Sequence, residues 1–311
     1  MKAASGTRIG WRDLPGGVRS AVEQIIGDEV VSAVSQVGGF SPGTADRVVT
    51  RSGGRAFVKA VSPAQNDTSV RLARQEATVV AALPAGVPAP RLLGRHDDGY
   101  WTVLIFEDVE GRNPRTPWVD RELAAAVAAL RELARAATPA PLTGLPAAAE
   151  VLRPLLAGWR NLAARPPADL DPWVLAHLGA LRAAADRALL AVRTGETLVH
   201  LDVRADNLLV RPDGTIVLVD WPHACIGPAW LDSVLLGLNV IVHGGAPGPA
   251  FAEVEPGVCT DALAGFAGYF LDIGRLPDPP GLPTVREFQR AQGAALLPWI
   301  RARLSTATPS Q

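Results

Sequence analysis

Up to about residue 109, short β-branched runs alternate with glycine-rich turns, a pattern typical of antiparallel strands. One run at residues 30–37 and two more within residues 45–61 predict three strands, and the second turn falls at Ser52-Gly53-Gly54. Ahead of them, the spacing of apolar residues predicts a helix over residues 18–26. The chain is therefore expected to begin with a small antiparallel sheet.

A helix and a hairpin complete this first part of the chain. Apolar residues at helical spacing predict a helix over residues 70–83, which ends before Pro84. Residues 91–96 and 100–106 then predict two strands, joined by a turn at Asp97-Asp98-Gly99.

The composition changes where this last strand runs into Glu107-Asp108-Val109 and a polar stretch. We expect a lobe boundary here, with one lobe over residues 1–109 and a second over residues 110–311. A strand that leaves a lobe exposes backbone amide and carbonyl groups, and these can hold the edge of an adenine without any particular side chain. Glu107 and Val109 are the candidates for such a hinge.

The second part of the chain is predominantly helical. Its segments are rich in alanine, which favours helix strongly, and proline-rich breaks separate several of them. The fold class predicted from both parts is α+β, with two lobes. The expected helices cover residues 120–137, 150–164, 171–192, 227–242, 260–274 and 284–304.

A short hairpin between Leu198 and Asp220 gathers polar side chains at one end. Asp202 and Asn207 precede its first strand, Asp220 ends its second, and the turn lies at residues 211–214. The hairpin can therefore bring the three side chains to one place. Carboxylate and amide oxygens are the ligands that Mg²⁺ prefers, so this cluster suggests magnesium chemistry.

A glycine-rich connection follows the first predicted strand. Gly38, Gly39 and Ser41 lie in it, and glycines let backbone amides approach the oxygens of a phosphate closely. The spacing does not match G-x-G-x-x-G, so a flexible turn is the alternative interpretation.

Lys59 and Glu76 form a candidate ion pair. In its predicted strand Lys59 shares a face with Phe57 and Val61, and a lysine on an apolar face needs an anion. An edge-strand lysine that extends to solvent is the alternative. Glu76 lies on the packing side of the next helix and offers the counter-ion.

Charge and cysteine content limit the kinds of partner. The chain has 30 basic and 31 acidic residues, so no overall field attracts nucleic acid or an anionic membrane, and a small molecule is the expected partner. Cys225 and Cys259 form no disulfide framework, which fits a reducing compartment. Without a signal-peptide core or a membrane-length apolar run, the expected location is cytoplasmic. The oligomeric state is left open.

Taken in order, these features resemble the protein kinase-like phosphotransferase fold, and within it the aminoglycoside phosphotransferase (APH) and choline kinase-like family. The resemblance extends from about Val31 to Leu236. Its strongest element is His200-x-Asp202-x-x-x-x-Asn207 followed by Asp220-Trp221. Leu201 stands where the family usually has glycine, and Pro222-His223 follows where the family usually has an acidic residue or glycine.

The resemblance implies an ATP- or GTP-dependent O-phosphotransferase that uses Mg²⁺. Asp202 would accept or orient the proton of the acceptor hydroxyl, and Asn207 with Asp220 would hold magnesium. Lys59 would contact the nucleotide phosphates while paired with Glu76. His200 would brace the loop.

Several roles stay open within that resemblance. Asp232 is interpreted as structural, either as a cap for the helix near Trp230 or as a brace for the catalytic loop. Arg204 and His223 lie beside the acceptor and either select the substrate, contact phosphate or pack the loop.

The acceptor is a small hydroxylated molecule, either an antibiotic such as an aminoglycoside or a macrolide, whose modification confers resistance, or a metabolite. Polycationic acceptors would favour a markedly acidic second lobe, whereas acids only slightly exceed bases in residues 221–311.

Two other classes of function are considered. A metal-dependent hydrolase could use His200, Asp202, Asp220 and His223, but it leaves the Lys59–Glu76 pair without a role. A nucleotide-binding regulator without catalysis would be expected to have lost one of the acidic or basic residues above. A protein kinase is disfavoured because the sequence has no Ala-Pro-Glu after Asp220.

Overall fold

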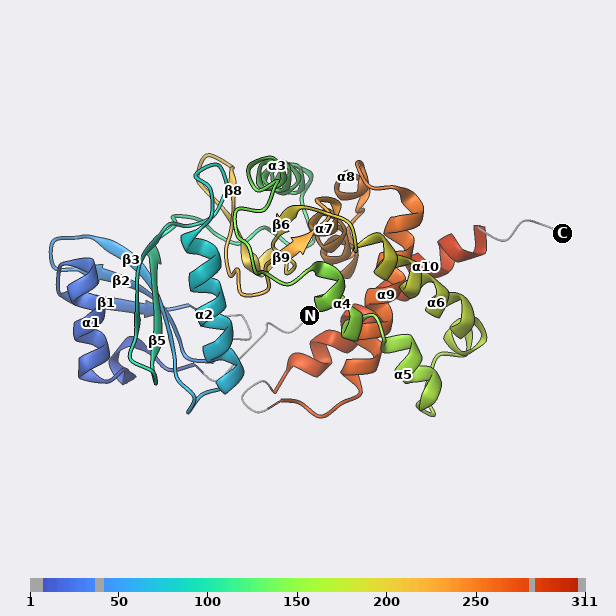
Figure 1. Ribbon diagram of the computed structural model, residues 1–311, viewed down its shortest axis with the longest axis horizontal. Helices are drawn as coiled ribbons and strands as arrows, with labels where there is room; N and C mark the ends of the chain where they lie inside the picture. The colour runs from blue at the N-terminus through green and yellow to red at the C-terminus, as the bar shows by residue number, and fades with distance from the viewer. Residues whose placement is uncertain (1–7, 37–41, 280–282, 307–311) are drawn as a thin grey trace.

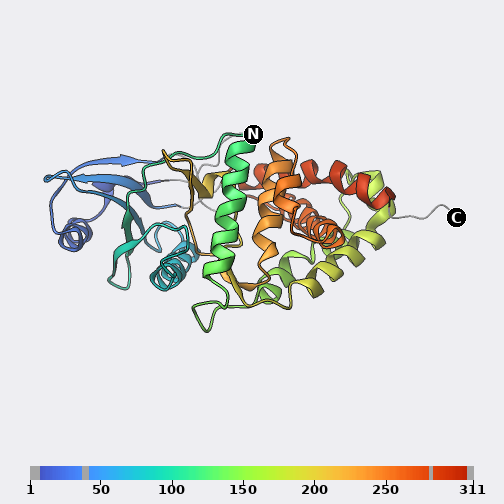
Figure 2. The ribbon, with the colours of Figure 1, turned by 90° about the horizontal axis from the view of Figure 1, so that it is seen from above.

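A computed structural model of the protein describes residues 8–36, 42–279 and 283–306. The sheet and its helices lie at one end of the long axis and the helical part at the other, as both views show (Figures 1 and 2). The predicted α+β class with two unlike parts is confirmed.

The first part contains one antiparallel sheet with strand order β1-β2-β3-β5-β4. Each predicted strand is present, and each predicted turn joins the expected neighbours. β5 is buried on both faces, as expected from its uninterrupted apolar run from Val103 to Phe106. The strands are β1 Val30–Ser35, β2 Thr44–Thr50, β3 Arg55–Val61, β4 Leu92–Asp97 and β5 Thr102–Glu107.

Two helices cover opposite faces of the sheet (Figure 1). The outer helix, α1 (Gly16–Ile26), follows a short 3₁₀ turn, η1 (Trp11–Asp13). The inner helix, α2 (Asp67–Ala81), begins three residues earlier than predicted. The side chain of Asn66 caps it by accepting a hydrogen bond from the Ser69 amide at 2.9 Å, so part of the polar stretch before residue 70 is its first turn.

The two faces of the sheet belong to different hydrophobic cores. On the outer face, Val48, Val58 and Ile105 pack with α1 in a core confined to the first part. On the inner face, Leu104 and Phe106 belong to a core that continues into the helical part. The inner face of the sheet is thus packed continuously with the rest of the molecule.

The helices of this second part differ from prediction in two places. The segment predicted as one helix over residues 150–164 is two helices, and Gly158 at the break packs so closely on α9 that an added Cβ would lie 2.2 Å from the Gly268 carbonyl oxygen. A short helix, α8, was not predicted. The helices are α3 Asp120–Ala136, α4 Ala148–Leu155, α5 Gly158–Ala164, α6 Pro172–Ala191, α7 Trp230–Val242, α8 Gly248–Phe251, α9 Pro256–Gly274 and α10 Val285–Thr306.

The predicted hairpin is present as β7 (Leu208–Val210) and β8 (Ile216–Leu218). A second small ladder, β6 (Thr197–Val199) with β9 (Cys225–Gly227), was missed because residues 200–224 separate its two short strands, and no tight turn marks their pairing as residues 211–214 mark that of β7 and β8. This ladder holds the two ends of the polar cluster together. In the described residues no helix combines the length and apolarity needed to cross a bilayer.

Candidate active site

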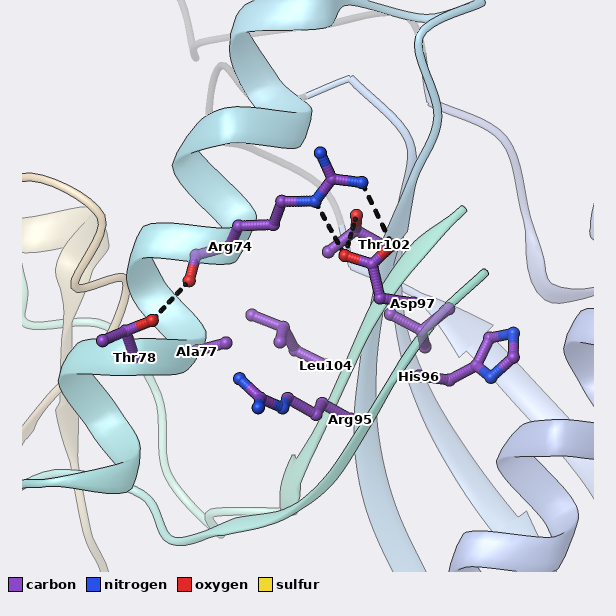
Figure 3. A pocket seen from close by; sticks show the side chains of 9 residues that line it. Arg74, Ala77, Thr78, Arg95, His96, Asp97, Thr102 and Leu104 are labelled. Atoms are coloured by element: carbon purple, nitrogen blue, oxygen red, sulfur yellow. Dashed lines mark hydrogen bonds and ion pairs between the residues drawn. The ribbon is translucent and has the colours of Figure 1, made fainter. Parts of the chain in front are cut away.

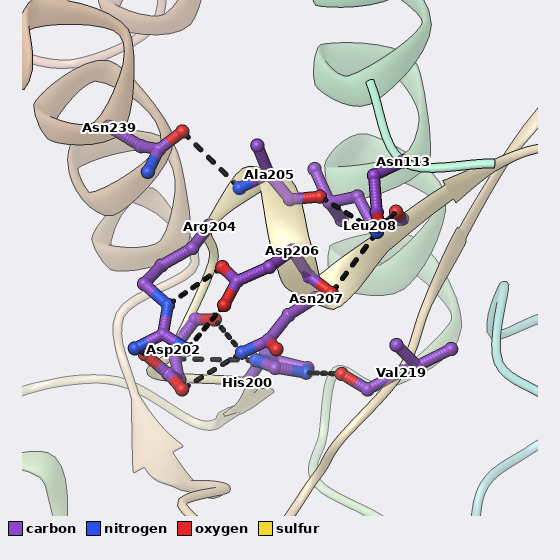
Figure 4. Close-up of polar contacts among 10 residues, drawn as sticks. All are labelled: Asn113, His200, Asp202, Arg204, Ala205, Asp206, Asn207, Leu208, Val219 and Asn239. Atoms are coloured by element: carbon purple, nitrogen blue, oxygen red, sulfur yellow. Dashed lines mark hydrogen bonds and ion pairs between the residues drawn. The ribbon is translucent and has the colours of Figure 1, made fainter. Parts of the chain in front are cut away.

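Asp202 and Asn207 lie against each other in the loop between β6 and β7 (Figure 4). The Asn207 amide nitrogen donates to the backbone carbonyl of Asp202 at 2.9 Å and to its carboxylate at 2.8 Å. A 3₁₀ turn, η2 (Ala205–Asn207), sets this geometry by turning the chain back on itself. Since the amide nitrogen faces Asp202, the amide oxygen of Asn207 is directed away from it.

His200 braces this loop through both ring nitrogens (Figure 4). Its Nδ1 accepts a hydrogen bond from the Asp202 amide at 3.2 Å, so the proton resides on Nε2, which donates to the Val219 carbonyl at 3.0 Å. The ring is fully buried and packs edge-on against Trp221, with the ring centroids 4.6 Å apart. Burial lowers the pKa of His200, which favours this neutral form.

Because His200 braces the loop, it is not available as a ligand in the metal cluster considered for a hydrolase. Its two nitrogens are both engaged with the backbone, and His223 is exposed. Across the described ranges, no group of three or more His, Cys, Asp and Glu side chains is arranged to hold a metal ion. The hydrolase interpretation is therefore not supported.

Asp232 of α7 holds the loop between β6 and β7 in place by hydrogen bonds. Its carboxylate accepts hydrogen bonds from the backbone amides of His200 at 2.7 Å and Leu201 at 2.9 Å. Both amides can point at one carboxylate because Leu201 adopts a left-handed conformation, with φ of 62°. This conformation favours glycine, the residue that the resemblance led us to expect at this position. Of the two structural roles considered for Asp232, the loop brace is the one observed, and burial raises its pKa.

Two asparagines that the sequence did not reveal also hold the loop (Figure 4). The Asn113 amide nitrogen lies 2.9 Å from the Leu208 carbonyl oxygen and within 3.3 Å of the carbonyls of Ala205 and Asp206. Asn239 accepts a hydrogen bond from the Ala205 amide at 3.3 Å. Asn113 stands in the polar stretch that marked the lobe boundary, so its only signal was its position.

Arg204 places a positive charge beside Asp202. Its Nη1 lies 3.6 Å from the Asp202 carboxylate, and its Nε and Nη2 each donate to Asp206 at 3.0 Å. The guanidinium also lies over the Phe288 ring, 5.9 Å from the centroid. Burial alone would lower the pKa of Arg204, but Asp202 and Asp206 raise it above its ordinary value. The contact with Phe288 joins α10 to the loop that carries Asp202.

Lys59, Glu76 and Asp220 form a charge cluster that bridges the two parts of the molecule. The Lys59 ammonium lies 2.7 and 3.0 Å from the two Glu76 oxygens and 2.8 Å from an Asp220 oxygen. The Trp221 amide also donates to Glu76, at 3.3 Å. The predicted pairing of Lys59 with Glu76 is present, and Lys59 extends from the strand face that carries Phe57 and Val61.

The electrostatics of this cluster follow from two carboxylates sharing one ammonium. Burial alone would lower the pKa of Lys59, but Asp220 and Glu76 raise it, so the lysine stays charged. Burial alone would raise the pKa of Asp220, but Lys59 lowers it to about 2. Burial raises the pKa of Glu76 despite Lys59. Asp220 is thus a stronger acid than Glu76. Its backbone lies in the left-handed region, with a φ of 70°.

Arg8 is a further cation near Asp220 that sequence reasoning missed. Residues 8 and 9 run beside Gly43, and the Ile9 amide donates to the Gly43 carbonyl at 3.2 Å. Burial lowers the pKa of Arg8, while Asp220 and Asp46 oppose that effect. No motif marks this segment, so only the folded chain reveals it.

The hinge candidates lie at the end of β5. The Glu107 amide donates to the Arg91 carbonyl at 3.0 Å, and the Val109 carbonyl accepts from the Arg47 guanidinium at 2.6 Å. Arg47 also pairs with Asp108 at 2.9 Å, which fixes this segment to β2. The glycine-loop candidates, Gly38, Gly39 and Ser41, lie outside the described residues.

Comparison with known proteins agrees with this geometry. The sequence profile described as "APH: Phosphotransferase enzyme family" matches residues 37–255. No curated protein matches the chain.

Solved structures with 12 to 16% sequence identity share its fold. An aminoglycoside phosphotransferase from Alicyclobacillus acidocaldarius is 16% identical, with a TM-score of 0.53 over 89% of this chain and 93% of that one. The choline kinase LicA from Streptococcus pneumoniae is 14% identical, with a TM-score of 0.59 over 90% and 98%. Amicoumacin kinase hAmiN, in complex with AMP-PNP, Ca²⁺ and Ami, is 12% identical, with a TM-score of 0.58 over 94% and 95%.

Proposed function

The chain belongs to the phosphotransferase enzyme family, and from this premise we propose that it transfers the terminal phosphate of ATP or GTP to a hydroxyl group of a small molecule. One observation carries the proposal. The Lys59 ammonium lies within 3.0 Å of carboxylate oxygens of both Glu76 and Asp220. Asp220 belongs to the same hairpin segment as Asp202 and Asn207, which contact each other. Phosphoryl transfer requires mainly positioning and neutralisation of phosphate charge, and these side chains supply both.

The residues present fit a magnesium ion. Asp220 is the stronger acid of its cluster, with a pKa of about 2, and the Asn207 oxygen is turned away from Asp202. These two oxygen donors would hold the ion, and one or two protein ligands suit Mg²⁺, which takes its remaining ligands from water and nucleotide phosphates. When bound, the ion supplies positive charge to the phosphate oxygens.

In this proposal each side chain has a separate task. Lys59 contacts the nucleotide phosphates, and Glu76 keeps its ammonium in place. Asp202 accepts the proton of the acceptor hydroxyl, and its carboxylate is oriented by the hydrogen bond from Asn207. Arg204 lies on the acceptor side of Asp202, where it favours an acceptor that carries hydrogen-bond acceptors near the reacting hydroxyl.

The first lobe, residues 1–109, would bind the nucleotide, and the second, residues 110–311, would bind the acceptor. The backbone from Glu107 to Val109, at and after the end of β5, would hold the base through groups other than the Glu107 amide and the Val109 carbonyl, which already have protein partners. Gly38, Gly39 and Ser41 stay candidates for contacts with the phosphates.

The experiment that tests the proposal is a screen for nucleotide consumption with aminoglycosides, macrolides, choline and sugars, followed by Asp202→Asn. Loss of the general base should lower kcat by about a hundredfold to ten-thousandfold and leave nucleotide affinity within a few-fold of wild type. Asp213→Asn, which changes an exposed acid at the tip of the same hairpin, is the matched control.

Two outcomes would count against the proposal. Turnover by Asp202→Asn within a few-fold of wild type would exclude Asp202 as the base. Normal nucleotide binding with no consumption for any hydroxylated compound would favour the regulatory alternative.

A further inference from the structure

A cavity of about 460 Å³ lies between α2 and the hairpin of β4 and β5 (Figure 3). β4 is the edge strand of the sheet, and the cavity opens to solvent, since its lining residues Arg74, Thr78, Arg95 and Asp97 are exposed. Its volume falls in the range of small-molecule sites. The lining residues are Arg74, Ala77, Thr78, Arg95, His96, Asp97, Thr102, Val103 and Leu104.

Two links connect the cavity to the charge cluster of the active site, one along the chain and one across the sheet. Ala77 in the cavity wall follows Glu76 directly along α2. Leu104 in its floor is the ladder partner of Lys59 between β3 and β5. Anything that fills the cavity therefore touches α2, which carries Glu76, and β5, which pairs with the strand that carries Lys59.

The charges in the cavity do not cancel. Arg74 donates two hydrogen bonds to Asp97, at 2.7 and 3.0 Å, which ties α2 to β4. These hydrogen bonds lower the pKa of Asp97 to about 2, so Asp97 stays negative and balances Arg74. Arg95 extends from β4 toward α2 (Figure 3), and within the described parts of the chain it forms no ion pair. One positive charge is thus left over.

We propose that this cavity binds a small organic anion, a phosphate or a carboxylate, with the charge on Arg95 and an apolar body against Ala77 and Leu104. A guanidinium presents paired donors that match the oxygens of phosphate and carboxylate groups. Ala77 and Leu104 are almost fully buried and give the cavity an apolar floor. The site is separate from the proposed nucleotide cleft and does not depend on the reaction assigned there.

A bound anion is predicted to strengthen nucleotide binding. It would bridge α2 and β4 in addition to the Arg74–Asp97 pair, and so hold Glu76 against Lys59. Such coupling between two sites is reciprocal, so the nucleotide should strengthen binding of the anion by the same factor.

Titration calorimetry with phenyl phosphate and with benzoate tests the binding site and distinguishes the two anions. Arg95→Gln should weaken binding of the preferred anion about tenfold or more, because it removes a charge-assisted pair. Arg71→Gln, an exposed arginine of the same helix outside the cavity, is the matched control and should leave the affinity unchanged. Thr78→Trp, which obstructs the cavity without changing its charge, should also abolish binding.

The nucleotide cleft is a competing site for these anions, and Lys59→Ala separates the two. Binding that survives in Lys59→Ala and is lost in Arg95→Gln supports the cavity. Binding that is lost in Lys59→Ala and survives in Arg95→Gln, or no binding by the wild-type protein, overturns the proposal.

The coupling has its own measurement. The affinity for AMP-PNP with Mg²⁺ should rise about fivefold at saturating anion in the wild-type protein and stay constant in Arg95→Gln. Equal AMP-PNP affinity with and without bound anion would overturn the coupling.

Discussion

The charge cluster of Lys59, Glu76 and Asp220 and the loop cluster of His200, Asp202, Asn207 and Asp232 are built on different principles. The first joins charged side chains as far as 161 residues apart through ion pairs. The second is mostly local and depends on hydrogen bonds to backbone groups, with the imidazole kept neutral by burial.

The two clusters differ in whether a ligand can replace their internal partners. One ammonium and two carboxylates leave the charge cluster with an excess negative charge, which a divalent cation with its nucleotide can take up by replacing internal partners. The loop cluster has its polar groups committed to the backbone, so it resists rearrangement and keeps Asp202 in a fixed orientation. Ligand binding should therefore remodel the first cluster and leave the second unchanged.

The strongest test of the charge cluster is Asp220→Asn, which removes a charge and preserves the shape. We expect the affinity for nucleotide with Mg²⁺ to fall more than about a hundredfold, and the affinity measured in EDTA to change little. Titration of a fluorescent nucleotide measures both, with Asp213→Asn as the control. If the Mg²⁺-dependent affinity stayed normal, Asp220 would have no part in holding the ion.

The loop cluster is tested by Asp232→Asn. An amide cannot accept from both the His200 and Leu201 amides, so one buried donor is left opposite another donor, at a cost of about 2 kcal/mol in the free energy of unfolding. Glu132→Gln breaks an exposed pair with Arg135 and should cost less than about 0.5 kcal/mol. Urea denaturation measures the two. Equal costs would show that the loop does not depend on Asp232.

The smallest effect is on the pH dependence of stability. Because burial lowers the pKa of His200 from 6.5, only the unfolded chain takes up its proton as the pH falls below about 6.5. The free energy of unfolding should therefore decrease toward acid, by at most about 1.4 kcal/mol per pH unit from this residue, and be unaffected by it above about pH 7.

His200→Asn supplies the comparison, since an asparagine can donate to Val219 and accept from Asp202 without titrating. The difference between the two proteins in urea denaturation at several pH values isolates His200, because the remaining histidines are common to both. Superimposable pH profiles would mean that the pKa of His200 does not differ between the folded and the unfolded protein.

The sequence was sufficient for those parts of the site that are set by local patterns. Strand alternation placed Lys59 on the inner face, helical spacing placed Glu76 opposite it, and the loop before the hairpin places Asn207 against Asp202. Each prediction required only the period of one element and the position of one turn.

The residues that hold the site in place through tertiary contacts could not be predicted, because no local pattern marks them. Asn113 and Asn239 act on backbone groups of a loop about 92 and 34 residues away, and nothing in their own neighbourhood marks that contact. Arg8 approaches Asp220 only because its segment runs beside Gly43. The break between α4 and α5 depends on how closely α9 approaches, which is also a tertiary effect.

The division of the sheet between two cores has a consequence for how the molecule opens. The outer layer, formed by α1 and the outer sheet face, shares no buried cluster with the helical part, whereas α2 and the inner face do. Local unfolding of α1 should thus be possible while the active site stays intact, whereas α2 should exchange its amide hydrogens only when the helical part also unfolds.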